Sequence, residues 1–254
     1  MNDNVPDAPA ILTRPDGATI AYRRVAGKGP TVVFLGGFKS DMTGTKATAL
    51  DAHCRAEGRA FLRFDYFGHG ASSGDFRQGT IGRWADDALA AIDILTDGPL
   101  VLVGSSMGSW IMLLAALARP ERIKALIGVA PAPDFTEDLM WPSFSPEVRA
   151  EIETKGEYAR PSAYGPDPYP ITRRLIEDGR KRLVMRQAVR LDVPVRILQG
   201  MRDPDVPWRH ALKLIEALKS KDVVLELIKD GDHRLSEPAD IAQLLRTVDE
   251  LCAG

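Results

Sequence analysis

The sequence predicts an α/β fold with a mostly parallel central sheet and helices on both of its faces. Short apolar runs rich in β-branched residues alternate along the chain with longer runs of helical character. Strands that are apolar throughout are typical of parallel sheets, because helices cover both faces of such a sheet. The chain has 254 residues, of which 44% are hydrophobic, so it can bury a large core as one domain spanning residues 1–254.

Eight runs have the character of strands. The first two flank Pro15-Asp16-Gly17, a turn sequence that favours a hairpin. The predicted strands are residues 11–13, 19–25, 31–35, 60–65, 100–103, 125–130, 195–199 and 223–228.

Helices are expected between these strands. Gly58 and Pro120 follow two of the helical runs and are residues at which helices commonly end. The predicted helices are residues 43–57, 80–95, 110–118, 208–219 and 237–252.

One segment interrupts this alternation. Between Pro131 and Pro194 the chain shows no convincing strand, although it carries Trp141 and several other aromatic residues among many prolines. A structureless loop of that length would be unusual in a compact domain. We therefore expect a helical cap inserted over the sheet at residues 131–194, with Trp141 in the substrate pocket beneath it. The alternative is a helical excursion remote from any site.

The stretch Gly104-Ser105-Ser106-Met107-Gly108 reads G-x-S-x-G and joins an apolar strand pattern to a long helical run. This context is typical of a nucleophile elbow, a sharp turn that exposes a serine hydroxyl at the start of a helix. Glycine is needed on both sides because a side chain would collide with the closely packed backbone. Ser106 is therefore the predicted nucleophile. A glycine-rich turn with a capping serine, for which Ser105 would serve equally, is the alternative.

A serine nucleophile needs a base, and the chain has only four histidines, His53, His69, His210 and His233. His233 follows the last predicted strand in the loop at its carboxyl end. Active sites of open parallel sheets lie at those ends, so His233 is the predicted base.

A carboxylate is expected to orient that imidazole and to stabilise its charged form. Asp203 and Asp205 both lie just past a predicted strand, and Asp203 comes first after the turn. We favour Asp203, since Asp205 is also placed to cap the next helix. The resulting order Ser106, Asp203, His233 is the Ser…Asp…His order of one class of hydrolases.

Acyl transfer also requires two N–H donors for the developing oxyanion. The residue after the nucleophile supplies the first, which assigns the N–H of Met107. The loop after the third strand supplies the second, and we assign the N–H of Phe38, which follows Gly36 and Gly37. A simple tight turn is the alternative for these two glycines.

Charge and composition exclude several classes of partner. The 33 basic and 35 acidic residues are scattered and give a net charge of −2, which argues against nucleic acid or an anionic membrane. Cys54 and Cys252 are too few for a disulfide scaffold and lack metal-site spacing. No apolar run reaches spanning length, and residues 1–7 resemble neither a signal nor a transit peptide. A cytoplasmic protein without metal is therefore expected.

Together these pieces resemble the α/β-hydrolase superfamily over nearly the whole chain. The matching segments are residues 35–38, 64–72, 104–108, 200–203, 206–207 and 231–233, and residues 40–47, 104–110, 206–208 and 232–234 are similar to a mitochondrial group of animal abhydrolases. That group is known for acyl-glucuronide esterase and palmitoyl-protein thioesterase activity. The resemblance implies hydrolysis of an ester or thioester, on a small molecule or an acylated protein, with no cofactor. Ser109 departs from it, standing where many relatives have glycine.

Two other functions fit the same pattern. An aminopeptidase would need an acidic anchor for a free amine, for which Glu137, Asp138 or Glu147 could serve. A non-catalytic ligand receptor could use the same scaffold, although it would be expected to lack part of the catalytic set.

Overall fold

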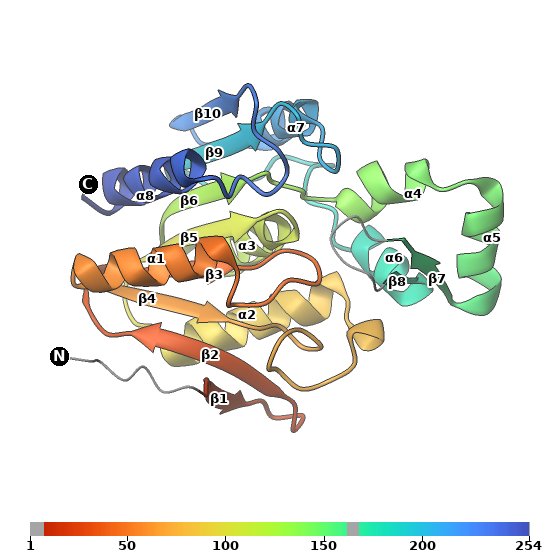
Figure 1. Ribbon diagram of the computed structural model, residues 1–254, viewed down its shortest axis with the longest axis horizontal. Helices are drawn as coiled ribbons and strands as arrows, with labels where there is room; N and C mark the ends of the chain where they lie inside the picture. The colour runs from red at the N-terminus through yellow and green to blue at the C-terminus, as the bar shows by residue number, and fades with distance from the viewer. Residues whose placement is uncertain (1–7, 162–167, 254) are drawn as a thin grey trace.

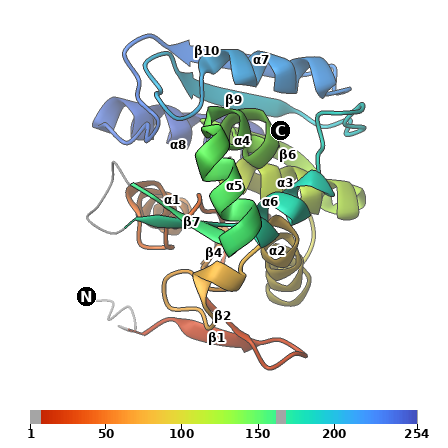
Figure 2. The same ribbon diagram turned by 90° about the vertical axis from the view of Figure 1, so that its right-hand side faces the viewer.

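The protein, a computed structural model that describes residues 8–161 and 168–253, is built around an eight-stranded sheet with helices on both faces (Figures 1 and 2). The strands are β1 (Ala10–Thr13), β2 (Thr19–Val25), β3 (Lys28–Leu35), β4 (Arg59–Phe64), β5 (Leu100–Ser105), β6 (Ile123–Val129), β9 (Val195–Gly200) and β10 (Val223–Ile228). Their spatial order is β1-β2-β4-β3-β5-β6-β9-β10. The pairs β1–β2 and β2–β4 are antiparallel, and every other neighbouring pair is parallel.

Five long helices cover the sheet, and the alternation of side chains along each strand divides the core into two layers. Val32 and Val101 pack against α1 (Thr45–Ala56) and α8 (Pro238–Ala253). Val33 and Leu102 point to the other face. That face is covered by α2 (Ile81–Leu95), α3 (Met107–Ala118) and α7 (Trp208–Ala217). Burial on both faces explains why these strands are apolar throughout.

The predicted strands and helices of this framework are confirmed, with shifts at their ends. The strand predicted at residues 31–35 begins at Lys28, and the helix predicted at residues 110–118 begins at Met107. The first residues of β3, Lys28 and Gly29, are exposed and carry no apolar signal, so the sequence pattern starts too late there.

The segment between β6 and β9 differs from the expectation. It forms a π-helical turn, η3 (Thr136–Met140), the helices α4 (Trp141–Ser143), α5 (Pro146–Lys155) and α6 (Arg173–Arg180), and the strands β7 (Glu157–Arg160) and β8 (Tyr169–Thr172). The expectation of a segment without strands is therefore wrong. Strands β7 and β8 form a separate antiparallel ladder of four residues each, too short for a clear alternation. Tyr164, one of the aromatic residues of this segment, and residues 1–7 lie outside the described part.

One buried carboxylate joins the two ends of this segment. Asp134 follows β6, is fully buried and has a φ of +57°. Its oxygens accept hydrogen bonds from the N–H groups of Val184 at 2.8 Å and Met185 at 2.9 Å, on the chain returning to β9. Figure 1 shows the helices between these points extending from the right side of the sheet.

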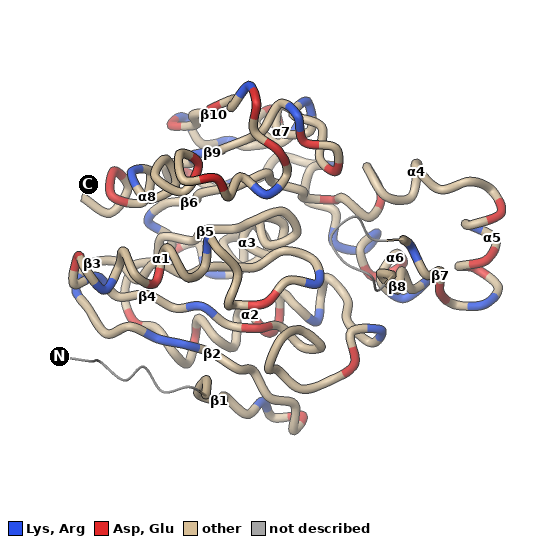
Figure 3. The backbone as a smooth tube through the Cα atoms, in the orientation of Figure 1, with Lys and Arg blue, Asp and Glu red and all other residues tan. Residues whose placement is uncertain are grey.

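Charges of both signs are interspersed along the chain (Figure 3). Within the described ranges, no helix combines the length and the apolar character that crossing a bilayer requires. Cys54 is buried and Cys252 is half-buried, and both are free thiols.

Candidate active site

Ser106 occupies the sharp turn between β5 and α3, with a φ of +54°. Only close packing around the turn can hold a serine in this strained conformation. A Cβ atom at Gly104 would lie 2.6 Å from the Cα of Ser109, and one at Gly108 would lie 2.0 Å from the carbonyl oxygen of Leu35. Both flanking glycines are therefore required by the packing. The hydroxyl of Ser106 makes no capping hydrogen bond to α3, so it is available to other partners.

Ser109, the residue that departs from the family pattern, fits the turn without displacing it. Its side chain is buried, and its hydroxyl donates to the carbonyl oxygen of Gly104 at 2.7 Å. This hydrogen bond satisfies the buried hydroxyl within the turn itself.

The structure brings Ser106, His233 and Asp203 together from three separate loops. The Nε2 atom of His233 lies 3.1 Å from the Oγ of Ser106, and its Nδ1 lies 2.8 Å from Oδ2 of Asp203. Because a carboxylate only accepts, Nδ1 carries the proton and Nε2 is left to accept from the serine hydroxyl.

Asp203 is buried and fully hydrogen-bonded, whereas its rival Asp205 is exposed. Oδ1 of Asp203 accepts from the N–H groups of Asp205 at 2.9 Å and Val206 at 2.8 Å. Oδ2 accepts from His233 and, at 3.2 Å, from Nε2 of Gln199. These donors hold the orientation of the carboxylate. Asp205 lines the neighbouring cavity and contributes its backbone N–H to this arrangement.

The two residues predicted to supply oxyanion donors lie beside Ser106. Phe38 and Met107 both line the cavity that contains Ser106, and among the described residues neither N–H has a hydrogen-bond acceptor. For Met107 this follows from its place at the start of α3, where N–H groups have no partner within the helix. A Cβ atom at Gly37 would lie 3.5 Å from the Cβ of Ser106, so the loop carrying Phe38 lies directly against the serine.

The cavity has a volume of about 610 Å³, and the segment between β6 and β9 forms one of its walls. That wall consists of Ala132, Phe135, Leu139, Met140, Ser143, Arg160 and Tyr169. Trp141 is not part of it, contrary to the expectation. The Arg180 guanidinium lies 4.7 Å from the centre of the Trp141 ring and that of Arg149 lies 5.6 Å away, so the indole packs against cations of the segment itself.

Sequence reasoning missed Lys46, which also lines the cavity. Its ammonium donates to the carbonyl oxygen of Arg234 and, at 3.3 Å, to the hydroxyl of Ser236. Burial and the nearby Arg234 lower the pKa of Lys46 to about 8. Lys46 therefore fastens the loop that follows His233 to α1. An isolated lysine in a helical run carries no sequence signal for such a role.

The remaining histidines and the proposed amine anchors lie elsewhere. His53 pairs with Asp249, and Nε2 of His210 lies 2.7 Å from the carbonyl oxygen of Pro133. On the inserted segment, Glu137 pairs with Arg180 and Asp138 with Arg186. None of Glu137, Asp138 and Glu147 is among the residues that line the cavity.

Potential metal ligands coincide with the same cluster. In the described part of the chain, Asp203, Asp205 and His233 form the one group of three such side chains whose ligand atoms lie within 4.8 Å of one another. Within this group, His233 and Asp203 are hydrogen-bonded to each other.

Comparisons with known proteins agree with this arrangement. A family model described as the alpha/beta hydrolase fold matches residues 30–158. The protein named "Palmitoyl-protein thioesterase ABHD10, mitochondrial" from Homo sapiens is 41% identical over 243 residues, which cover 95% of this chain and 79% of that protein. The solved mouse alpha/beta hydrolase domain-containing protein 10 is 40% identical with a TM-score of 0.89, covering 96% of this chain and 98% of that one. A solved structure from Agrobacterium vitis S4 is 44% identical with a TM-score of 0.91, covering 96% and 97%. The chain therefore belongs to the α/β-hydrolase family.

Proposed function

We propose that the protein is a serine hydrolase that cleaves carboxylic esters or thioesters through an acyl-enzyme intermediate on Ser106. The observation that carries this proposal is the continuous hydrogen-bonded series from Asp203 through His233 to the Ser106 hydroxyl, 2.8 Å and 3.1 Å long, at the edge of a cavity. A serine hydroxyl becomes nucleophilic when an adjacent base takes its proton, and this geometry provides that base.

The reaction follows from these positions. His233 Nε2 takes the hydroxyl proton as Ser106 Oγ attacks the substrate carbonyl, and Asp203 stabilises the imidazolium that forms. The N–H groups of Phe38 and Met107 donate to the oxyanion as it develops. As the carbon–oxygen or carbon–sulfur bond of the substrate breaks, the imidazolium gives its proton to the leaving oxygen or sulfur. An alcohol or thiol departs, and the acyl group stays on Ser106. A water molecule, activated by the same imidazole, releases the acid and restores the hydroxyl.

The substrate class is proposed from the cavity and from the relatives. Phe135, Leu139 and Met140 give the cavity an apolar wall suited to an acyl chain. The relatives at 41% identity carry the name palmitoyl-protein thioesterase, which supports acylated substrates, whether small molecules or proteins. The same relatives are named mitochondrial, so the cytoplasmic location expected from the sequence has no support from them.

The two other candidate functions have less support. An aminopeptidase needs a carboxylate in the cavity to hold the substrate amine, and the proposed anchors Glu137 and Asp138 are paired with arginines outside the cavity wall. A receptor without turnover would have no use for a base aligned on a serine. We therefore favour the hydrolase.

The decisive experiment is active-site labelling with a fluorophosphonate, which phosphonylates activated serines. Ser106→Ala is expected to abolish both labelling and hydrolysis of a 4-nitrophenyl ester, lowering kcat by roughly 10⁴-fold or more. Ser105→Ala is the matched control, because Ser105 precedes Ser106 in the same turn and should retain both properties. Labelling that persists in Ser106→Ala, or that maps to Ser105, would contradict the assignment.

A further inference from the structure

His69 is a buried histidine that the proposed mechanism does not use. It follows β4 in the loop between Gly68 and Gly70, and only 3% of its surface is exposed. Its ring packs edge-on against the rings of Tyr66, Phe76 and Trp84, with centroids 5.0 to 5.6 Å away. It does not line the cavity, so it cannot touch a substrate there.

The two hydrogen bonds of the His69 ring determine its protonation state. Nδ1 lies 3.2 Å from the carbonyl oxygen of Phe67, which can only accept, so Nδ1 carries a proton. Nε2 lies 3.1 Å from the backbone nitrogen of Lys39, which can only donate, so Nε2 is an unprotonated acceptor. Both partners are satisfied only by the neutral ring. Burial lowers the pKa of His69 to about 4, consistent with that state.

Lys39 is the residue next to Phe38, and its backbone is strained. Its φ is +55°, a conformation that is costly for a residue with a side chain. The turn from Gly37 to Ser40 is closed by the N–H and the hydroxyl of Ser40, which donate to the carbonyl oxygen of Gly37 at 3.2 Å and 2.8 Å. The peptide that joins Phe38 to Lys39 is held by a further hydrogen bond, in which its N–H donates to Nε2 of His69.

The same aromatic residues hold both His69 and Phe38. The Phe38 ring lies 4.9 Å from Phe76 and 5.9 Å from Trp84, centroid to centroid, and both of these rings also contact His69. The side chain and the following peptide of Phe38 are thus fixed together against one rigid cluster.

We propose that His69 is a positioning residue for the oxyanion-binding loop. By accepting the Lys39 N–H, it turns the neighbouring peptide so that the Phe38 N–H stays free and directed into the cavity. This inference rests on the proposed function, because it assigns a role only if an oxyanion forms on Ser106. It adds a residue that acts on the rate without contacting the substrate.

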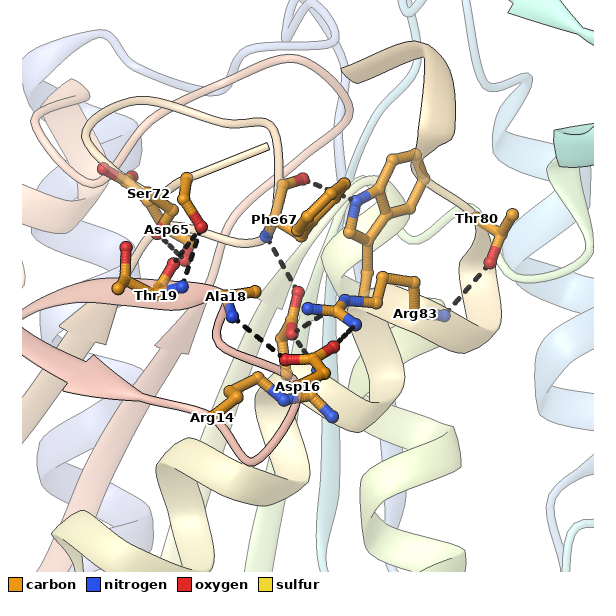
Figure 4. A network of polar contacts seen from close by, with 12 residues as sticks. Arg14, Asp16, Ala18, Thr19, Asp65, Phe67, Ser72, Thr80 and Arg83 are labelled. Atoms are coloured by element: carbon orange, nitrogen blue, oxygen red, sulfur yellow. Dashed lines mark hydrogen bonds and ion pairs between the residues drawn. The ribbon is translucent and has the colours of Figure 1, made fainter. Parts of the chain in front are cut away.

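The loop that carries His69 is itself tied down by a polar network (Figure 4). The Phe67 N–H donates to the buried carboxylate of Asp87 at 2.8 Å, and the Trp84 indole donates to the Phe67 carbonyl at 3.0 Å. The Ser72 hydroxyl donates to the Asp65 carbonyl at 2.6 Å. These hydrogen bonds fix the loop and therefore the position of Nε2 of His69, the acceptor.

The test compares two substitutions of similar length. His69→Gln keeps an amide oxygen that can accept from Lys39, whereas His69→Met keeps the bulk without a comparable acceptor. For hydrolysis of a 4-nitrophenyl ester, His69→Met should lower kcat by about 100-fold, the scale of losing one oxyanion donor, with KM nearly unchanged. His69→Gln should recover at least about tenfold of that loss. Active sites counted by fluorophosphonate labelling normalise every rate to folded protein.

A second readout isolates the oxyanion. A trifluoromethyl ketone forms a tetrahedral adduct with an activated serine and places an oxyanion between the two donors, so its inhibition constant should rise in His69→Met in step with the fall in kcat. Tyr66→Phe is the control in the same cluster, because it removes a hydroxyl that has no hydrogen-bond partner among the described residues. Its kcat should stay within about twofold of the wild-type value.

Two results would overturn the inference. One is a normal kcat per active site in His69→Met. The other is an equal loss in the Met and Gln variants with unchanged affinity for the ketone, which indicates general loosening of the fold. These results are distinct from those expected if the proposed function is wrong. In that case Ser106→Ala retains turnover, whatever the activity of the His69 variants.

Discussion

Asp203 and Asp205 are two residues apart, yet the structure gives them different surroundings. Asp203 is buried and accepts four hydrogen bonds, one of them from His233 Nδ1. Asp205 contributes its backbone N–H to that set and lines the cavity. Asp203 is preferred from the sequence because it comes first after the strand, and the geometry agrees with that preference. The catalytic role of Asp203 stays a prediction.

Substitution separates the two carboxylates. Asp203→Asn should lower kcat by roughly 10³- to 10⁴-fold, because an amide that donates to Nδ1 favours the wrong tautomer of His233. Asp205→Asn should cost about tenfold or less, since its N–H remains. Steady-state kinetics of both variants on one ester, with active sites counted by fluorophosphonate, checks this. A larger loss at Asp205 would show that the wrong carboxylate was chosen.

At the level of elements, hydrophobic pattern predicts the framework well, and it fails where elements are short or polar. Strands such as β5 are buried on both faces and helices such as α2 carry a broad apolar face, so their patterns are strong. Strands β7 and β8 have four residues each and pair only with one another, so their stability comes from tertiary contacts that no local pattern records.

The loop after β4 should also affect stability in acid through His69. Its pKa is about 6.5 in the unfolded chain and about 4 in the folded protein, where burial opposes the charge. Between these values the unfolded state binds more protons, so the stabilising contribution is complete above pH 6.5 and is lost as the pH falls towards 4. The full effect is about 3 kcal/mol.

Urea denaturation at pH 7 and pH 4 tests this expectation. The free energy of unfolding of the wild type should fall by about 3 kcal/mol more than that of His69→Gln. The comparison must be made between the two proteins, because burial raises the pKa values of Asp65, Asp87 and Asp134, and these groups favour the folded state in the same acid range. Parallel pH dependence in both proteins would refute the assigned shift.

At the level of the whole molecule, the cavity forms where the sheet meets the segment between β6 and β9. Sequence motifs predict the site residues that follow the strands, because the carboxyl ends of parallel strands meet at one edge of the sheet. The cavity wall formed by the segment between β6 and β9 could not be predicted in this way. The sequence pattern favours Trp141 as one of the aromatic residues of this segment, yet Leu139 and Met140, in the π-helical turn just before it, line the cavity.

Acyl-chain selectivity should follow this wall. We expect kcat/KM to rise from acetyl to medium-chain esters and thioesters by at most about fourfold per methylene, the equivalent of 0.8 kcal/mol. Leu139→Trp should fill the cavity and flatten the rise while acetyl ester hydrolysis stays close to normal. Trp141→Ala, outside the wall, should leave the rise intact. A wild-type preference for acetyl, or a uniform loss in Leu139→Trp, would remove the support for an acyl pocket.

The single carboxylate of Asp134 has a consequence for how this protein can change over evolution. It bonds the chain just after β6 to the chain at Val184 and Met185, so the excursion between them starts and ends at one point in space. A segment with coincident ends can be lengthened, shortened or exchanged at little entropic cost to the rest of the chain. No strand of the sheet would need a new neighbour. Changes in this segment can thus alter the substrate preference without altering the catalytic residues, provided that Asp134 is retained.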